Sequence, residues 1–141
     1  MQSPNIWGPI AWNFLNCVVM SYPLVPTDEA KTNMRHFFTN FGTVLPCGKC
    51  RLNYVKHLEK FPLNDTVLAS RTNLIKWLID IHNEVNKSTG KRVLTYDEGV
   101  KCMLEQYNDN GSMKWCFTVI IAIIFIIVIL IGGFLGWKQR S

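Results

Sequence analysis

The stretch LPCGKC, at residues 45–50, anchors the interpretation of the whole chain. A proline before a Cys-x-x-Cys pair places Cys47 and Cys50 in the first turn of a helix, where free backbone N–H groups and the helix dipole favour a thiolate. Lys49 and Arg51 add positive charge, which would lower the thiol pKa further. The pair is also half of a tetrahedral zinc site, but no second Cys-x-x-Cys or His-x-x-x-His follows it. The motif therefore favours redox chemistry over metal binding.

Apolar spacing and capping residues on both sides of this motif predict helices and hardly any strand. Helices are expected from Pro4 to before Tyr22, from Thr27 to before Pro46, from the cysteine pair to Phe61, from Ser70 to about Lys87, and from Thr95 to about Tyr107. Residues 62–70 are expected to cross as a polar loop. The predicted fold class is all-α, a four-helix bundle with a short fifth helix.

The first helix has apolar residues at spacings of three and four, which predicts the face that points inward. This face comprises Trp7, Ile10, Ala11, Phe14, Cys17 and Val18. Cys17 is accordingly expected to be a buried thiol. The phenylalanines of the second helix are expected to be plain core.

Residues 116–135 contain no charged side chain and are flanked by Trp115 and Trp137. Such a run predicts a transmembrane helix, assigned to residues 115–137. It would follow a first domain at 1–108 and a linker at 109–114, and precede a basic tail at 138–141. The N-terminal residues lack a basic start followed by an apolar core, so no signal peptide is expected. The chain is thus expected to be a single-pass protein with a C-terminal anchor.

The formal net charge is +5, and Lys138 and Arg140 in the tail supply two of these charges. The remaining basic residues are dispersed, so nucleic acid is not an expected partner. The two tail cations favour a cytoplasmic tail. An anchor this close to the C-terminus without a signal peptide instead leaves the preceding domain in the cytosol. A cytosol-facing domain is the expectation.

The fourth helix and the loop after it carry a group of polar side chains. His82, Asn83, Asn86 and Lys91 offer an imidazole, two amides and a cation within ten residues. These groups suit the ring edges, ribose and phosphates of a nucleotide, and the interior of a bundle suits a planar cofactor. The competing interpretation is that His82 is a hydrogen-bonded structural histidine.

Three separated motifs together carry a resemblance to a known family. They are Trp7-Gly8-x-x-x-Trp12, Leu45-Pro46-Cys47-x-x-Cys50, and Trp77-Leu78-x-x-x-His82-Asn83-x-Val85-Asn86-x-x-x-Gly90-Lys91. In these motifs the chain, from residue 5 to about 105, resembles the flavin-linked sulfhydryl oxidases of the Erv/ALR type. Its short N-terminal region and C-terminal anchor are similar to the compact forms of large DNA viruses. That similarity implies a host intracellular membrane or a virion membrane.

The resemblance implies a thiol oxidase that holds FAD non-covalently and forms a homodimer. Electrons would pass from a dithiol through the Cys47–Cys50 disulfide to FAD and then to O2, giving H2O2. Cys47 would exchange with the incoming thiol, and Cys50 would lie next to the flavin. The matching FAD-binding positions are Trp7, Gly8, Trp12, Tyr54, His82, Asn83, Val85, Asn86 and Lys91.

The chain departs from the family pattern in three places. Asn16, assigned to the FAD site, stands where the family commonly has a histidine; it keeps hydrogen bonding but loses a ring. Ile79 and, approximately, Tyr96 stand where many members have a structural disulfide, which indicates replacement by apolar packing. No second Cys-x-x-Cys can relay electrons within the chain. A separate small dithiol protein is therefore the expected donor, and it would dock directly at Cys47.

Two other functional classes are weighed against the oxidase. A thioredoxin-like disulfide exchanger would need strands around its Cys-x-x-Cys pair, and the sequence predicts helices there. A non-enzymatic membrane adaptor would use its aromatic residues for packing alone and its cysteines for metal binding or static bridges. Bound flavin and oxygen consumption driven by dithiols would separate these classes.

Overall fold

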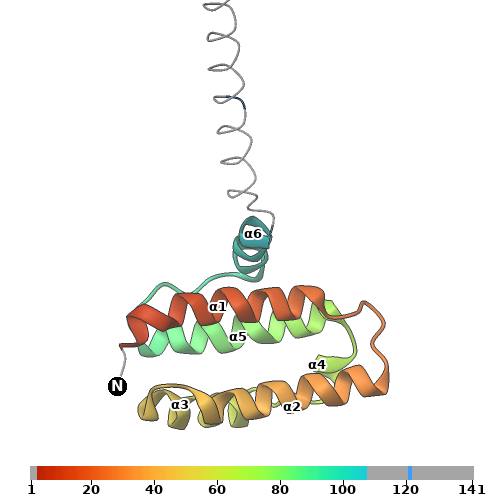
Figure 1. Cartoon of the computed structure of the whole chain (residues 1–141), viewed down its shortest axis with the longest axis horizontal. Coiled ribbons are helices and arrows are strands. Elements are labelled where there is room, and N and C mark those ends of the chain that lie inside the picture. The colour runs from red at the N-terminus through yellow and green to blue at the C-terminus, as the bar shows by residue number, and fades with distance from the viewer. Residues whose placement is uncertain (1–2, 108–120, 122–141) are drawn as a thin grey trace, which may run out of the picture. The chain divides into compact units, whose positions relative to one another are not determined.

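The computed structural model describes residues 3–107 and residue 121. Within this part of the chain every regular element is an α-helix (Figure 1). The helices are α1 (Pro4–Ser21), α2 (Asp28–Val44), α3 (Gly48–Lys60), α4 (Asp65–Leu68), α5 (Arg71–Ser88) and α6 (Tyr96–Tyr107). The all-α class predicted from the sequence is confirmed for the described residues.

Side chains at the helix ends explain where the helices begin and stop. The hydroxyl oxygens of Thr27 and Ser70 cap α2 and α5 by accepting backbone N–H groups at 3.1 and 3.2 Å. Thr95 and Glu98 form the predicted capping box of α6, in which each side chain accepts the backbone N–H of the other, at 3.3 and 2.8 Å. Gly90 has a φ of 69° and stops the chain after α5, as predicted.

The helices pack in two layers with α6 added outside them. α1 and α5 lie side by side, and α2 and α3 form the opposite layer (Figure 1). The short α4 contacts both α2 and α5, so it links the layers at one end. α6 packs on α1 and α5 on the side away from α2 and α3. α5 is the central helix, because it contacts α1, α3, α4 and α6.

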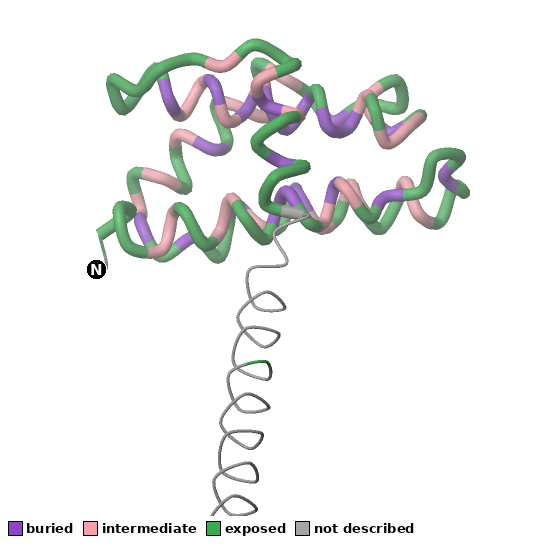
Figure 2. Tube along the Cα trace, turned by 90° about the horizontal axis from the view of Figure 1, so that it is seen from above, coloured by how far each residue is buried: buried purple, intermediate pink, exposed green. Residues whose placement is uncertain are grey.

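α5 also contributes the largest part of the hydrophobic core. Its buried apolar residues are Leu74, Ile75, Trp77, Leu78, Ile79 and Ile81. The ring of Phe38 from α2 meets the Trp77 ring edge-on, with centroids 4.8 Å apart. The Trp77 Nε1–H donates to the Phe61 carbonyl at 2.8 Å, so the indole is both packed and hydrogen-bonded. Figure 2 shows buried residues recurring along the long helices with exposed residues between them.

The prediction of an uninterrupted polar loop over residues 62–70 was wrong. Asp65–Leu68 form α4, and the Asn64 side-chain oxygen caps it by accepting the Val67 N–H at 3.0 Å. Leu68 is fully buried. A single turn of helix contains too few residues for apolar spacing to reveal it, which is why sequence reasoning missed α4.

The predicted inward face of α1 was also partly wrong. Ile10 and Phe14 are 69% and 54% exposed, and Cys17 is an exposed free thiol, not a buried one. The residues that α1 buries are Leu15, Asn16 and Val19. Apolar residues lie on more than one side of this helix, so spacing alone fits two faces. Packing against α5 selects the face that is buried.

The predicted membrane helix at residues 115–137 lies outside the described residues, apart from residue 121. The same holds for Cys116, the linker and the basic tail. Among the helices that are described, none has the combination of length and apolar character that crossing a membrane requires.

Candidate functional site

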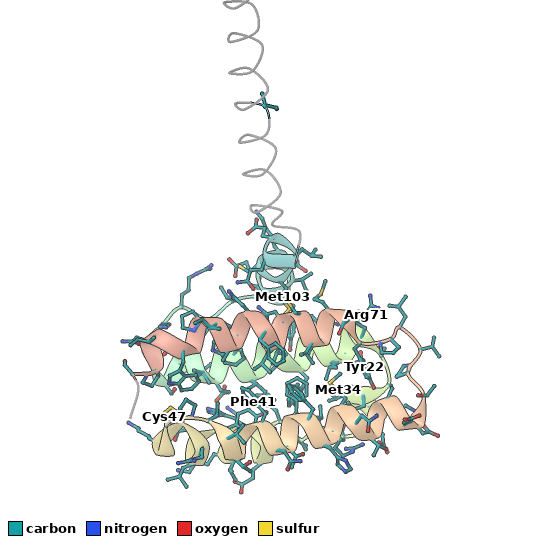
Figure 3. The ribbon with its side chains drawn as sticks, in the orientation of Figure 1. Tyr22, Met34, Phe41, Cys47, Arg71 and Met103 are labelled. Carbon is teal, nitrogen blue, oxygen red and sulfur yellow. A yellow bond between two sulfur atoms is a disulfide. The ribbon has the colours of Figure 1, made fainter. Side chains whose placement is uncertain are left out.

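A disulfide joins Cys47 and Cys50 at the start of α3, with their Cα atoms 5.1 Å apart. Cys47 is the N-cap residue, and its sulfur accepts the backbone N–H of Cys50 at 3.2 Å. Figure 3 shows Cys47 at the end of the bundle where α1 begins. Both cysteines thus occupy the helix start that the sequence predicted. When the disulfide opens, the N–H of Cys50 and the helix dipole stabilise a thiolate on Cys47.

The exposure of the two sulfur residues does not select one of them for attack. Cys47 is 9% exposed, while Cys50 is half-buried against the core. The division of roles between Cys47 and Cys50 stays a prediction. Arg51 donates to the Thr43 carbonyl at 3.4 Å, which holds the start of α3 against the last turn of α2. The lowering of the thiol pKa by Lys49 and Arg51 concerns the reduced pair and also stays a prediction.

Tyr54 lies one turn after Cys50 and supports this helix from below. It is buried, and its hydroxyl donates to the Phe38 carbonyl in α2 at 2.9 Å. Its ring lies against Gly42, where an added Cβ would come within 2.3 Å of the ring. Burial raises the pKa of Tyr54, so the phenol stays protonated and keeps donating. The described contacts of Tyr54 are structural, and its predicted part in holding FAD is not tested by them.

Trp12 and His82 form an aromatic pair between α1 and α5. Their ring centroids are 4.0 Å apart and their planes differ by 15°, so the rings are stacked. Burial lowers the pKa of His82, and the positive charge of Lys91 lowers it further. The imidazole is therefore neutral near pH 7. Two residues predicted from separate motifs meet here, and the cation of Lys91 acts on the same place.

Two buried polar atoms of α1 have no hydrogen-bond partner within the described part of the chain. They are Nε1 of Trp7 and Oδ1 of Asn16, and both residues were predicted to hold the cofactor. A Cβ added at Gly8 would meet nothing within 4 Å, so the helix surface is open beside Trp7. Leaving buried polar atoms unpaired costs about 1–3 kcal/mol each, which favours a bound group that supplies the missing partners.

Asn83 and Asn86 of α5 shape the loop that carries Lys91. The Asn83 amide donates to the Leu94 carbonyl at 2.8 Å and accepts the Leu94 N–H at 2.9 Å. The Asn86 carbonyl accepts the Lys91 N–H at 2.8 Å, and the Asn86 side chain is buried. Val85, also predicted at the FAD site, is half-buried. Asn83 therefore contributes by fixing the backbone at Leu94, a role that sequence reasoning did not assign.

Gln106 of α6 is a further residue that sequence reasoning missed. Its side-chain oxygen accepts a hydrogen bond from Asn16 Nδ2 at 2.8 Å, across 90 residues of sequence. Gln106 follows Gly99 and Met103 at spacings of four and three, and both of those are buried against the bundle. This spacing was the available signal, because it places Gln106 beside the inward face of α6.

The residues present fit a flavin dinucleotide better than a metal. In residues 3–107 no three side chains of His, Cys, Asp or Glu gather as metal ligands would. The site instead offers a stacked aromatic pair, a neutral imidazole, a nearby lysine and two unmatched buried polar atoms. Planar rings, a phosphate chain and polar ring edges are the complementary features of FAD.

Comparisons with known proteins agree with this assignment. A family model described as Erv1 / Alr family matches residues 9–108. The chain is 48% identical over 118 residues to a probable FAD-linked sulfhydryl oxidase, R368, of Acanthamoeba polyphaga mimivirus, covering 82% of each protein. It is 34% identical to the mitochondrial FAD-linked sulfhydryl oxidase ERV1 of Saccharomyces cerevisiae, covering 60% of this chain and 43% of that protein.

A solved structure gives the same relation. The crystal structure of the FAD binding domain of Erv1 from Saccharomyces cerevisiae is 29% identical to the chain and superposes with a TM-score of 0.66. The match covers 72% of this chain and 93% of that one. The similarity thus extends over the described helices as well as over the three sequence motifs.

Proposed function

Since the chain belongs to the Erv1/Alr family, we propose that it is an FAD-linked thiol oxidase, which forms disulfides in partner proteins. The observation that carries the proposal is the Cys47–Cys50 disulfide at a helix start, in the same domain as the Trp12–His82 stack. A thioredoxin-like exchanger is not favoured, because the elements around this disulfide are helices over the whole described range.

The chain's own part of the reaction is thiol–disulfide exchange. A partner thiolate attacks the sulfur of Cys47, a new S–S bond forms to the partner, and the bond to Cys50 breaks. Cys50 leaves with the electron pair as a thiolate. The partner's second thiolate then attacks its own bridged sulfur and releases Cys47, whose charge the N–H of Cys50 stabilises. The partner ends as a disulfide, and the Cys47–Cys50 pair carries its two electrons.

Residues from α1, α5 and the following loop would hold the cofactor. Trp12 and His82 suit its rings, Trp7 Nε1 and Asn16 Oδ1 suit its polar edges, and Lys91 suits its phosphates. When bound, FAD supplies a two-electron acceptor that O2 reoxidises with release of H2O2. The remaining predicted positions, Gly8, Tyr54, Val85 and Asn86, belong to the same proposed site.

The test is to purify the full chain, record its flavin spectrum, and measure oxygen consumption with a small dithiol. The parent should carry tightly bound flavin and consume oxygen. The Cys50→Ser variant should keep the flavin and fall to background turnover, because a lone thiol cannot re-form the disulfide. Colourless protein would remove the oxidase proposal. Bound flavin with turnover unchanged in Cys50→Ser would show that the cysteine assignment is wrong.

We also propose that the physiological electron donor is a separate small dithiol protein that docks at Cys47. The support is that Cys17 and Cys102, the other described cysteines, are free and exposed, and neither belongs to a second Cys-x-x-Cys pair. The Cys17→Ser/Cys102→Ser double variant should therefore keep its turnover of a small dithiol within about twofold of the parent. Loss of turnover in that variant would point to a relay within the chain.

A second copy of the chain is the proposed occupant of an apolar face of α1. Ile6, Ile10 and Phe14 are 66%, 69% and 54% exposed on one side of this helix. Phe14 meets Phe37 of α2 edge-on with centroids 6.2 Å apart, so the apolar surface continues onto α2. A homodimer would cover it. Ile10→Lys should shift the full chain from dimer to monomer in light scattering, and an unchanged mass would contradict the proposal.

The membrane anchor remains part of the proposal. Residues 116–135 are uncharged between two tryptophans, which supports a membrane helix that leaves residues 1–108 on the cytosolic side of a host intracellular or virion membrane. The full chain should stay with membranes in alkaline extraction, and protease added outside intact vesicles should digest the helical domain. Release by alkali would remove the anchor.

A further inference from the structure

The inference concerns Asn16 and Gln106, and it rests on the proposed FAD site. Asn16 is 7% exposed and lies on α1, one helical turn beyond Trp12. Its Nδ2 donates to Gln106 Oε1 at 2.8 Å, while its Oδ1 is buried with no partner among the described residues. One end of the amide is therefore fixed by α6, and the other end is an unmatched acceptor.

An amide side chain can turn over and exchange its donor and acceptor ends. Which end of Asn16 points to the cofactor therefore depends on what its neighbour offers. Gln106 presents an oxygen, so it holds Nδ2 toward α6 and leaves Oδ1 toward the site. A neighbour that could only donate would favour the opposite orientation and turn Nδ2 toward the cofactor.

We propose that Gln106 is a positioning residue for FAD: by accepting from Asn16, it orients the Asn16 carbonyl oxygen to accept a hydrogen bond from an N–H group of the cofactor. FAD carries such donors on its adenine and on its isoalloxazine ring. Three features keep α6 in place for this contact. They are the burial of Met103 in Figure 3, the seat of Gly99 on Ile79, and the bond from Tyr96 to Asp80 at 2.9 Å.

The test uses two variants in which charge and hydrogen bonding predict opposite results. Gln106→Glu can only accept and adds a negative charge; Gln106→Lys can only donate and adds a positive one. Attraction to the phosphates of FAD would by itself tighten binding in the lysine variant and weaken it in the glutamate variant. Orientation of Asn16 predicts the reverse. Glu105→Lys, at the exposed neighbouring position, measures the effect of charge alone.

The measurement is the FAD dissociation constant of the full chain after flavin removal, followed by flavin fluorescence. Gln106→Lys should weaken binding about tenfold, and Gln106→Glu should stay within about threefold of the parent. The loss should disappear in an Asn16→Leu background, because the effect passes through Asn16. Competition with adenosine diphosphate and with FMN assigns the donor, since the half that carries it loses affinity in Gln106→Lys.

Other outcomes overturn the inference. If the two variants follow their charges, or if all affinities match the parent, Gln106 does not orient Asn16 for the cofactor. A lower melting temperature of the flavin-free Gln106→Lys protein with unchanged FAD affinity would mean that the bond only attaches α6. Failure of the parent to bind FAD would remove the proposed function itself, so the two failures are distinguishable.

Discussion

α3 and α6 flank the central helix α5 but are held in place by different means. α3 is attached through buried groups: Tyr54 lies against Gly42 with its hydroxyl on the Phe38 carbonyl, and Trp77 donates to the Phe61 carbonyl just after the helix. α6 is attached through a few small or exposed groups. They are Gly99 on Ile79, Met103, the Tyr96–Asp80 hydrogen bond and the Gln106–Asn16 hydrogen bond.

The difference separates the reactive group from the groups that position the cofactor. α3 carries the Cys47–Cys50 disulfide, which must keep its place while its bond opens and closes. α6 carries no cysteine of a pair, yet it and the loop before it contact Asn16 and Asn83 of the proposed FAD site. Weakening α3 should therefore cost global stability, whereas weakening α6 should mainly cost cofactor affinity.

The largest contrast is expected from adding one methyl group under each helix. Gly42→Ala would put a Cβ 2.3 Å from the ring of Tyr54, and the rigid buried ring has little room to move. Gly99→Ala would put a Cβ 2.8 Å from Ile79 Cδ1, the end of a side chain that can turn. Urea unfolding should show a loss of about 2 kcal/mol for Gly42→Ala and less than about 1 kcal/mol for Gly99→Ala. Equal losses would contradict the contrast.

The loop before α6 should come next in size. Asn83→Leu removes both hydrogen bonds to the Leu94 backbone and leaves its N–H and carbonyl unpaired. The free energy of unfolding should fall by about 1.5 kcal/mol. FAD should also bind about tenfold more weakly, because the loop carries Lys91. Asn73→Leu is the matched control: it breaks a single exposed bond to the Thr66 carbonyl, and FAD affinity should not change. The comparison fails if both variants lose affinity equally.

Sequence reasoning recovered what is encoded locally. The Thr95–Glu98 capping box, the stop at Gly90 and the cysteine pair at a helix start each depend on residues a few positions apart, and the structure contains all three. The stacking of Trp12 on His82 followed from a resemblance that joined distant motifs. Periodicity by itself would not have paired these two rings.

The parts that were missed depend on contacts between distant segments. The exposed side of α1, where Ile10 and Phe14 lie, is as apolar as the buried side, so only its packing partner distinguishes them. The bond of Gln106 to Asn16 joins residues from opposite ends of the domain. The replacement of a disulfide by Ile79 was predicted as apolar packing, and Ile79 indeed lies buried against Gly99.

A matched pair of hydroxyl deletions should sharpen the comparison further. Tyr54→Phe removes a buried donor and leaves the Phe38 carbonyl without it, whereas Tyr96→Phe removes an exposed bond to Asp80. Tyr96 is 46% exposed, so water can replace its hydroxyl at Asp80. Thermal or urea unfolding should give a loss of about 1 kcal/mol for Tyr54→Phe and about 0.3 kcal/mol for Tyr96→Phe. A larger loss for Tyr96→Phe would mean that α6 is the more firmly held helix.

The smallest effect is expected from the ion pair that ties α3 to α5. Hydrogen bonds from Lys60 and Lys87 lower the pKa of Glu84 from 4.5 to about 2. A lowered pKa stabilises the fold above the unfolded-state value, and this stability is lost as the pH falls from about 4.5 toward 2. Both lysine side chains are more than half exposed, at 55% and 56%, so water screens the pair.

The contribution of Glu84 at pH 7 should therefore be below about 1 kcal/mol. In Glu84→Gln, urea unfolding should show a flatter decline in stability between pH 5 and pH 3 than in the parent. Glu59→Gln makes the same charge change on α3 at a carboxylate that forms no ion pair within residues 3–107, and its pH profile should follow the parent. If both variants flatten the profile alike, net charge sets the acid sensitivity, and the Lys60–Glu84 pair does not contribute to holding α3.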